Sequence, residues 1–276
     1  MMKRAAALSA LACLLAVTAA APAVSNAPAR GRDTASRAAG KASALDAVPR
    51  RGVLRVCTTG DYRPFSYRDP GTGRYRGVDI EMARDLAKSL DARPRYVATI
   101  WARLVGDLSA GRCDIAMGGV SVTLARARSV YFSEPTRTDG KTPLARCTDK
   151  DKYRTLRQID RPGTRVIVNP GGTNEEFARS HLKHATLTVH PDNTTIFDEI
   201  IAGRADVMMT DASETRYQAK IHPQLCSLHP DKPFTFSEKA YALPRGDDEF
   251  KAYVDQWVHL ATHDGTYRKY EDAWLT

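Results

Sequence analysis

Residues 110–117 read AGRCDIAM, and residues 202–209 read AGRADVMM. Both stretches share the pattern AGRxD, an apolar β-branched residue, any residue, and methionine. A glycine between a helical apolar pattern and a short apolar run predicts the end of a helix, its C-cap and the start of a buried strand. The flanking patterns also match, so the sequence predicts two similar α/β lobes.

Working outward from the first copy, strands are predicted at 53–58, 95–100 and 114–118. The segment 77–90 has apolar residues every four positions, and 101–110 has a second helical pattern. Alternating strands and helices indicate a parallel sheet with helices packed against it.

The second copy lies in the same arrangement. Strands are predicted at 165–169, 186–190 and 206–210, with one helix beginning at Asn174 and another around 196–201. We therefore expect an α/β fold with two lobes, each a mainly parallel sheet flanked by helices. Ligands of parallel sheets bind beyond the carboxyl ends of the strands, which predicts a cleft between the lobes.

The expected lobe boundaries are 52–143 for lobe 1 and 144–234 for lobe 2. The remaining chain, about 235–274, includes an amphipathic segment at 248–262 and is expected to complete lobe 1.

The N-terminal segment has the layout of a secretory signal peptide: a basic start, an Ala-rich apolar run and small residues near Ala23. We expect a signal at 1–23, a linker without regular structure at 24–50, and an exported protein, periplasmic or secreted, with no stable membrane insertion after cleavage. Residues 1–51 contain 8 Lys and Arg against 2 Asp and Glu, so they account for most of the net charge of +9. Composition therefore gives no support for a nucleic-acid partner.

Four cysteines remain after signal cleavage: Cys57, Cys113, Cys147 and Cys226. An exported protein can form disulfides, and four cysteines allow three pairings. The sequence does not decide among them, and buried free thiols are an alternative. We favour Cys147 with Cys226. The cysteines show no CxxC spacing, so they give no support for a metal site.

The residues after the predicted strands are the candidate site. Thr123 and Arg126 are spaced as a helix cap and a first-turn cation, which suits a carboxylate. Asp211 can bind an ammonium group, and Tyr62, Phe65 or Trp101 can pack against a carbon skeleton. A small anionic or amphoteric ligand fits this set.

The strings GVLRVCTTGDYRPFSY, RGVDIEMARDLAKSL and ADVMMTDASE resemble the polar amino-acid class of periplasmic solute-binding proteins, which have the type II two-lobed fold. More specifically, CTTGDYRPF, NPGGTNEEF, EKAYALPR and YVDQWVHLA resemble the cyclohexadienyl dehydratases. These are exported carbon–oxygen lyases of that fold that act on prephenate and arogenate.

The resemblance implies roles for individual residues. Glu175 in GGTNE matches the general acid, Arg126 the group that binds the α-carboxylate, and Asp211 the ammonium-binding position. It also implies further cleft residues: Asp61, Tyr62, Trp101, Ser121, Thr123, Lys141 and Thr173. One departure is Ala125, where many relatives have a glutamate before the arginine.

The expected chemistry needs one positioned acid and no metal, nicotinamide or other cofactor. A first-turn glutamate should have its pKa lowered by the helix dipole, whereas a general acid must be protonated. We expect desolvation and the substrate's carboxylates to reverse this only in the complex. The alternative function is a non-catalytic amino-acid receptor of an ABC transporter, because one fold serves both.

Overall fold

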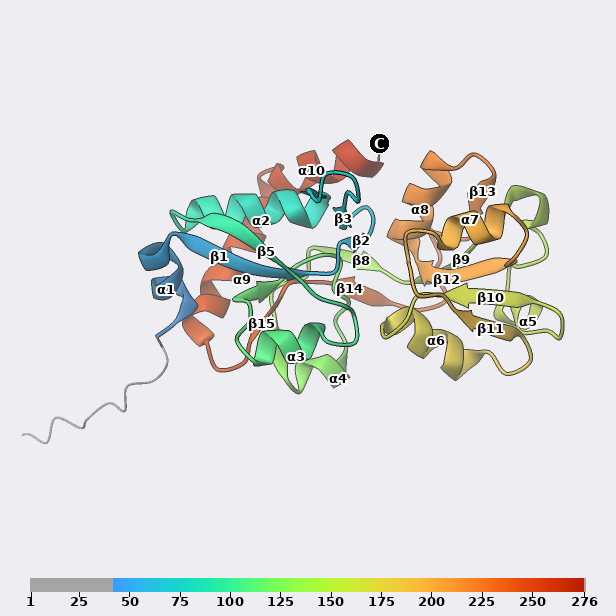
Figure 1. The fold of residues 1–276 in the computed structure, drawn as a ribbon, viewed down its shortest axis with the longest axis horizontal. Helices are drawn as coiled ribbons and strands as arrows, with labels where there is room; N and C mark the ends of the chain where they lie inside the picture. The colour runs from blue at the N-terminus through green and yellow to red at the C-terminus, as the bar shows by residue number, and fades with distance from the viewer. Residues whose placement is uncertain (1–41, 276) are drawn as a thin grey trace, which may run out of the picture. The chain divides into compact units, whose positions relative to one another are not determined.

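The computed structural model describes residues 42–275, which form two five-stranded sheets covered by helices (Figure 1). The orders β5-β1-β6-β15-β7 and β11-β10-β12-β9-β13 are equivalent, and in both the first three strands are parallel. We call the parts built on these two sheets lobe 1 and lobe 2. The predicted two-lobed α/β fold is confirmed.

Lobe 1 contains both ends of the described chain. Its strands are β1 (Val53–Thr58), β5 (Arg93–Ala98), β6 (Ile115–Ala116), β7 (Val130–Phe132) and β15 (Ala242–Pro244), with a small side sheet of β2 (Asp61–Tyr62), β3 (Ser66–Arg68) and β4 (Tyr75–Arg76). Its helices are α1 (Ala44–Arg51), α2 (Val78–Ser89), α3 (Leu104–Ser109), α4 (Leu124–Ala127), α9 (Asp248–His263) and α10 (Thr266–Leu275).

Lobe 2 is built from the middle of the chain. Its strands are β9 (Lys141–Arg146), β10 (Arg165–Val168), β11 (Thr186–Val189), β12 (Val207–Asp211) and β13 (Leu225–Ser227). Its helices are α5 (Leu156–Ile159), α6 (Thr173–His181), α7 (Ile196–Ile201) and α8 (Ala212–Ile221), and a 3-10 turn, η1 (Cys147–Asp149), follows β9.

Two antiparallel strands, β8 (Arg137–Asp139) and β14 (Ser237–Lys239), connect the lobes. The first leads from β7 to β9 and the second from β13 to β15, so each passes once between the sheets (Figure 1). Lobe 2 strand β9 begins at Lys141, slightly before the expected boundary at 144. Both sheets also contain antiparallel strands, including β9 and β15. The alternating strand and helix pattern of the sequence did not predict them.

One expectation is wrong. Residues 44–50 were expected to belong to the unstructured linker, but they form most of α1, which buries Ala44 and Val48. The Asp247 carboxylate accepts hydrogen bonds from the Ser43 hydroxyl (2.6 Å) and the Ala44 N–H (2.8 Å). Ser43 is also the N-cap of this helix, since its hydroxyl accepts from the Leu45 N–H (3.2 Å), and this local signal was missed. The signal predicted at 1–23 and the linker up to residue 41 lie outside the described residues.

Successive strand residues point to opposite faces of each sheet, which gives each lobe two core layers. In lobe 2, Val166 and Val168 pack toward Phe177 of α6, whereas Ile167 packs toward Phe197 of α7. In lobe 1 the helices α1, α2, α9 and α10 cover one face, and α3 covers the other. Helices thus pack against both faces of each sheet.

The two AGRxD stretches have the same atomic role. Asp114 accepts from the Arg55 backbone N–H (2.8 Å) and its guanidinium (2.6 Å), and Asp206 accepts from the same groups of Arg165 (2.9 and 2.5 Å). Each aspartate thereby locks the start of one strand to its neighbour. The repeat therefore reflects a shared structural need of both lobes.

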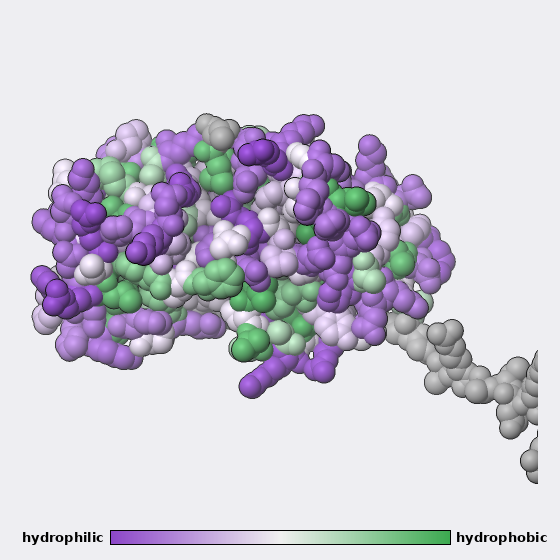
Figure 2. All heavy atoms as spheres, turned by 180° about the vertical axis from the view of Figure 1, so that it is seen from behind, coloured by the Kyte–Doolittle hydropathy of each residue, from purple (hydrophilic) through white to green (hydrophobic). Residues whose placement is uncertain are grey.

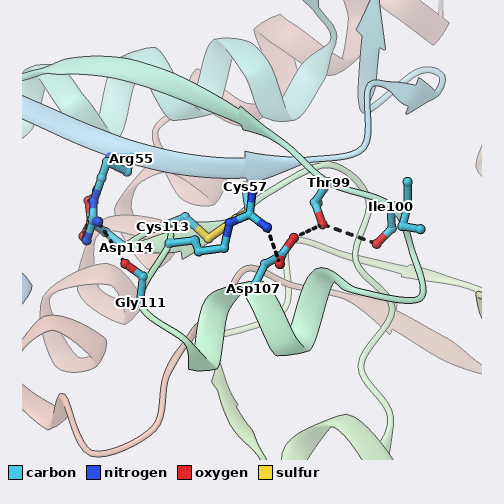
Figure 3. The surroundings of a disulfide bond; sticks show 9 residues. Arg55, Cys57, Thr99, Ile100, Asp107, Gly111, Cys113 and Asp114 are labelled. Atoms are coloured by element: carbon cyan, nitrogen blue, oxygen red, sulfur yellow. Dashed lines mark hydrogen bonds and ion pairs between the residues drawn. A yellow bond between two sulfur atoms is a disulfide. The ribbon is translucent and has the colours of Figure 1, made fainter.

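Both lobes contain a disulfide. Cys147 pairs with Cys226, as we favoured, and Cys57 pairs with Cys113. The second bond lies beside the Arg55–Asp114 pair (Figure 3). A crosslink within each lobe restricts its unfolded chain without restraining movement between lobes.

The face in Figure 2 is mainly hydrophilic, and its apolar residues occur in small groups between polar ones. Within residues 42–275, no helix combines the length and apolar character that a membrane span requires.

Gly140 lies between β8 and β9, where the chain crosses into lobe 2, and its close packing allows a first prediction. A Cβ on Gly140 would lie 1.9 Å from the Thr235 carbonyl oxygen, a backbone atom that has little freedom to move. We expect Gly140→Ala to lower the unfolding free energy by about 2 kcal/mol or more. Gly106→Ala is the control, because nothing lies within 4 Å of its added Cβ and it is helical. Urea unfolding of both variants measures this, and equal stabilities would contradict the packing argument.

Candidate active site

A small cavity of about 10 Å³ lies where the two lobes meet. It is enclosed by side chains and glycines from the ends of several strands, and its lining residues are Tyr62, Trp101, Gly119, Ser121, Arg126, Asn169, Gly172, Thr173, Asn174, Asp211 and Lys239. A volume this small holds about one water molecule, so a larger ligand requires the lobes or side chains to separate.

The centre of this cleft is Asp211, which ends β12 and is 2% exposed. One carboxylate oxygen, Oδ2, accepts from the Tyr62 hydroxyl and from Lys239 Nζ, both at 2.6 Å. The other, Oδ1, lies 2.8 Å from Lys141 Nζ. Burial raises the pKa of Asp211, but the two ammonium groups lower it further, so the carboxyl is ionised.

Lys141 begins β9 and connects Asp211 to the first turn of α6. Its Nζ donates to the Thr173 hydroxyl (2.9 Å) and to Asn174 Oδ1 (2.5 Å). Asn174 in turn donates to Asn169 Oδ1 (2.8 Å) and the Thr210 hydroxyl (3.0 Å). This network fixes the glycine-rich loop before α6 against the ends of β10 and β12.

Arg126 is the cation on the lobe 1 side. Thr123 caps α4 as predicted, since its hydroxyl accepts from the Arg126 N–H at 3.2 Å. The guanidinium donates to the Ser121 carbonyl (2.9 Å), and burial lowers the Arg126 pKa. Because α4 has only four residues, the guanidinium rather than a helix dipole must supply the positive charge.

Aromatic side chains form the apolar wall. The rings of Tyr62 and Trp101 meet edge to face at 5.5 Å, and the Trp101 indole donates to Asp61 Oδ1 (3.2 Å). Burial raises the pKa of Asp61, which lies behind the indole rather than on the cavity surface. Phe65 stacks on Tyr62 at 5.6 Å and is fully buried.

Glu175 lies in the first turn of α6, next to the cleft but outside the cavity lining. Its carboxylate accepts from the Gly171 N–H (2.7 Å) and from Arg179 Nε (2.8 Å). These two donors, in that order, lower the Glu175 pKa. The direction agrees with the sequence prediction, and the structure adds these two hydrogen-bond donors as its causes.

The structure thus gathers most of the predicted residues around one point. Six of them line the cavity: Tyr62, Trp101, Ser121, Arg126, Thr173 and Asp211. Thr123 and Lys141 line an adjoining cavity of about 390 Å³, which shares Ser121 and Thr173 with the first.

The sequence prediction missed three polar groups of the cleft: Lys239, Asn169 and Asn174. Asn174 directly precedes Glu175 in GGTNE, so its position in the motif was an available signal. Lys239 does not follow any of the predicted parallel strands, so it was not among the residues expected at the strand ends.

A further acid lies behind Asp211. Glu214 in α8 is fully buried and accepts from the Thr210 hydroxyl (2.6 Å) and the Asn193 amide (3.2 Å). Desolvation raises its pKa to about 8, with smaller contributions from Asp61 and Asp211. This carboxyl is therefore protonated at neutral pH.

The raised pKa of Glu214 predicts a pH-dependent stability. Between the ordinary value of 4.5 and about 8, the folded protein holds a proton that the unfolded chain releases, so stability falls as pH rises. We expect Glu214→Gln to remove a slope of up to about 1.4 kcal/mol per pH unit. Urea unfolding from pH 5 to 8 tests this, and parallel curves for the two proteins would contradict it. Asp79, with a pKa raised to about 6, contributes equally to the pH dependence of the wild type and of Glu214→Gln.

Comparisons with known proteins place this arrangement in a family. The model of bacterial extracellular solute-binding proteins, family 3, matches residues 54–276. The chain belongs to this family. A family 3 fold accounts for the two lobes, and the family's extracellular character agrees with the predicted export.

Among family 3 relatives, the cyclohexadienyl dehydratase of Pseudomonas aeruginosa is 54% identical over 233 residues, which are 84% of this chain and 86% of the relative. An L-cystine-binding protein of Escherichia coli is 25% identical over 84% of this chain and 85% of the relative.

The solved structures include an ancestral cyclohexadienyl dehydratase, 54% identical with a TM-score of 0.54 over 85% of this chain and 97% of the other. An ancestral amino acid-binding protein, described as a precursor of cyclohexadienyl dehydratase, is 35% identical. Its TM-score is 0.78, and the match covers 85% of this chain and 100% of the other.

Proposed function

We propose that this protein is a cyclohexadienyl dehydratase that converts prephenate to phenylpyruvate and L-arogenate to L-phenylalanine. The main support is the 54% identity over most of both chains to a protein of that name, more than twice the identity to the cystine-binding relative. The reaction makes the enzyme a carbon–oxygen lyase. We further propose that residues 1–23 direct its export.

The charges of the cleft suit prephenate. Across this cavity and the adjoining one, Arg126, Lys141 and Lys239 supply three cations, and Asp211 and Glu176 supply two anions, which leaves a net positive charge. A net charge of this sign in a buried site favours a ligand with two carboxylates. The Tyr62 and Trp101 rings offer an apolar surface for the cyclohexadiene ring.

In the reaction, the bond between the ring and its carboxylate breaks and releases CO2. The bonding electrons enter the ring, the carbon–oxygen bond opposite breaks, and the leaving hydroxyl takes a proton to become water. The ring becomes aromatic, so no metal, redox group or covalent intermediate is needed. The protein has to hold the dianion and supply one proton.

We assign the proton to Glu175. With its contacts to Gly171 and Arg179 the carboxylate is ionised, so the acid must form when these contacts loosen. Nearby substrate carboxylates and exclusion of water both raise a carboxyl pKa. The proposed cycle therefore has substrate binding, lobe closure and protonation of Glu175 before the chemical step.

The assay is direct. Purified protein is incubated with prephenate at pH 7 to 8, and phenylpyruvate is measured by its absorbance in alkali against a protein-free blank. Turnover that depends on protein concentration is expected. No product, together with tight binding of an amino acid by calorimetry, would favour the non-catalytic receptor instead.

A further inference from the structure

Lys239 is a buried lysine at the floor of the cleft, 2% exposed, at the end of the connecting strand β14. Its Nζ contacts Asp211 Oδ2 (2.6 Å), the Ser121 hydroxyl (2.8 Å) and the Tyr62 hydroxyl (3.3 Å). An ammonium group has three protons, so all of them are used. Lys239 is therefore held in one position, with its charge at the point where both lobes and the connecting strands meet.

Lys239 and Lys141 pair both oxygens of Asp211 with an ammonium group. Oδ2 accepts from both Lys239 and Tyr62, and Oδ1 faces Lys141. A buried carboxylate between two ammonium groups is a strong ion-pair cluster because little water screens it. A ligand ammonium placed at Asp211 would therefore lie beside two lysine ammonium groups and experience their repulsion.

The other acids near the cleft lie outside the lining of the smaller cavity. Glu214 is protonated at neutral pH, and Asp61 is paired with the Trp101 indole behind the cavity. Asp139 on β8 is engaged by the Ser213 hydroxyl and the Gly140 N–H. Glu176 lies on the adjoining cavity, near Arg126. Among the described residues that line the smaller cavity, Asp211 is the one acid, and each of its oxygens lies within 2.8 Å of a lysine ammonium group.

We propose that Lys239 determines substrate specificity: by occupying Asp211 together with Lys141, it selects the 2-oxo dicarboxylate prephenate over its amino-acid counterpart arogenate. The two substrates differ at one carbon, which has a keto oxygen in prephenate and an ammonium group in arogenate. The cationic cleft stabilises the first and opposes the second. This inference rests on the proposed dehydratase function.

The test compares kcat/KM for prephenate and arogenate in the wild type and in Lys239→Met, which removes the charge and keeps an unbranched side chain only one atom shorter. We expect the prephenate-to-arogenate ratio to be above one in the wild type and to fall at least about tenfold in the variant. The change should come mainly from KM. A purely structural role would lower kcat/KM for both substrates together and leave the ratio unchanged.

A second variant separates the charge effect from damage to the fold. Asp211→Asn combined with Lys239→Met removes one charge of each sign and leaves no carboxylate to bind ammonium. Its ratio should return toward the wild-type value, even where total activity falls. Lys232→Met, at an exposed position, removes one positive charge outside the cavity lining and should leave the ratio within twofold.

Binding of the two products makes the inference independent of turnover. Calorimetry with phenylpyruvate and phenylalanine should show the same shift toward the amino acid in Lys239→Met. If the wild type converts neither substrate, the proposed function fails, while this comparison still tests Lys239. Ratios of activity and of affinity that stay within twofold of wild type in Lys239→Met would overturn the inference.

Discussion

Glu175→Gln is expected to lower kcat for prephenate by about 10²- to 10⁴-fold, the range typical of removing a general acid. Glutamine keeps the size of the side chain, and its amide oxygen can still accept the Gly171 N–H that binds Glu175. Its amide protons are not acidic, so it cannot protonate the leaving hydroxyl. The loss should therefore appear in kcat, with the affinity for phenylpyruvate changed by less than about threefold.

Glu199→Gln is the matched control for this experiment. Glu199 also lies in a lobe 2 helix and pairs with an arginine, Arg204, at 2.7 Å, but it is outside both cavities of the cleft. Its kcat should stay within about twofold of wild type. Full dehydratase activity in Glu175→Gln would remove this residue from the mechanism and leave the acid to be sought elsewhere in the cleft.

The outcome for Glu175 illustrates what sequence reasoning could and could not predict. Its helix position, and therefore a lowered pKa, followed from the pattern after the glycine pair. The actual donors, Gly171 and Arg179, depend on rotamers and on loop geometry that no periodicity encodes. A local rule thus predicted the direction of the pKa shift but not the two donors that the structure shows.

The fold was predictable because it follows from short-range patterns. Each AGRxD turn joins a helix to a strand within a few residues, and its aspartate binds an arginine on the neighbouring strand. Features that depend on distant parts of the chain were not predictable. Asp247 holds the start of α1 by accepting from Ser43 and Ala44, and Lys239 reaches the cleft on a strand that crosses between the lobes.

The largest effect on stability is expected in the ion-pair cluster of Asp211, Lys141 and Lys239. Asp211→Asn would leave Lys141 and Lys239 buried at 5% and 2% exposure with no carboxylate between them. Breaking a buried ion pair by removing one partner costs about 3–5 kcal/mol, because the remaining charge stays in a medium of low polarity. We expect a loss of that size in the free energy of unfolding.

Urea unfolding at pH 7 measures this loss, with Asp231→Asn as the control. Asp231 pairs with Arg216 at 2.5 Å but its side chain is 90% exposed, so its removal should change stability by less than about 1 kcal/mol. Adding Lys239→Met to Asp211→Asn should recover part of the loss, because it removes one of the two unpaired ammonium groups. Equal stability of wild type and Asp211→Asn would mean that water reaches the lysines, and the cleft would then lack the low-polarity environment on which its selection of a dianion depends.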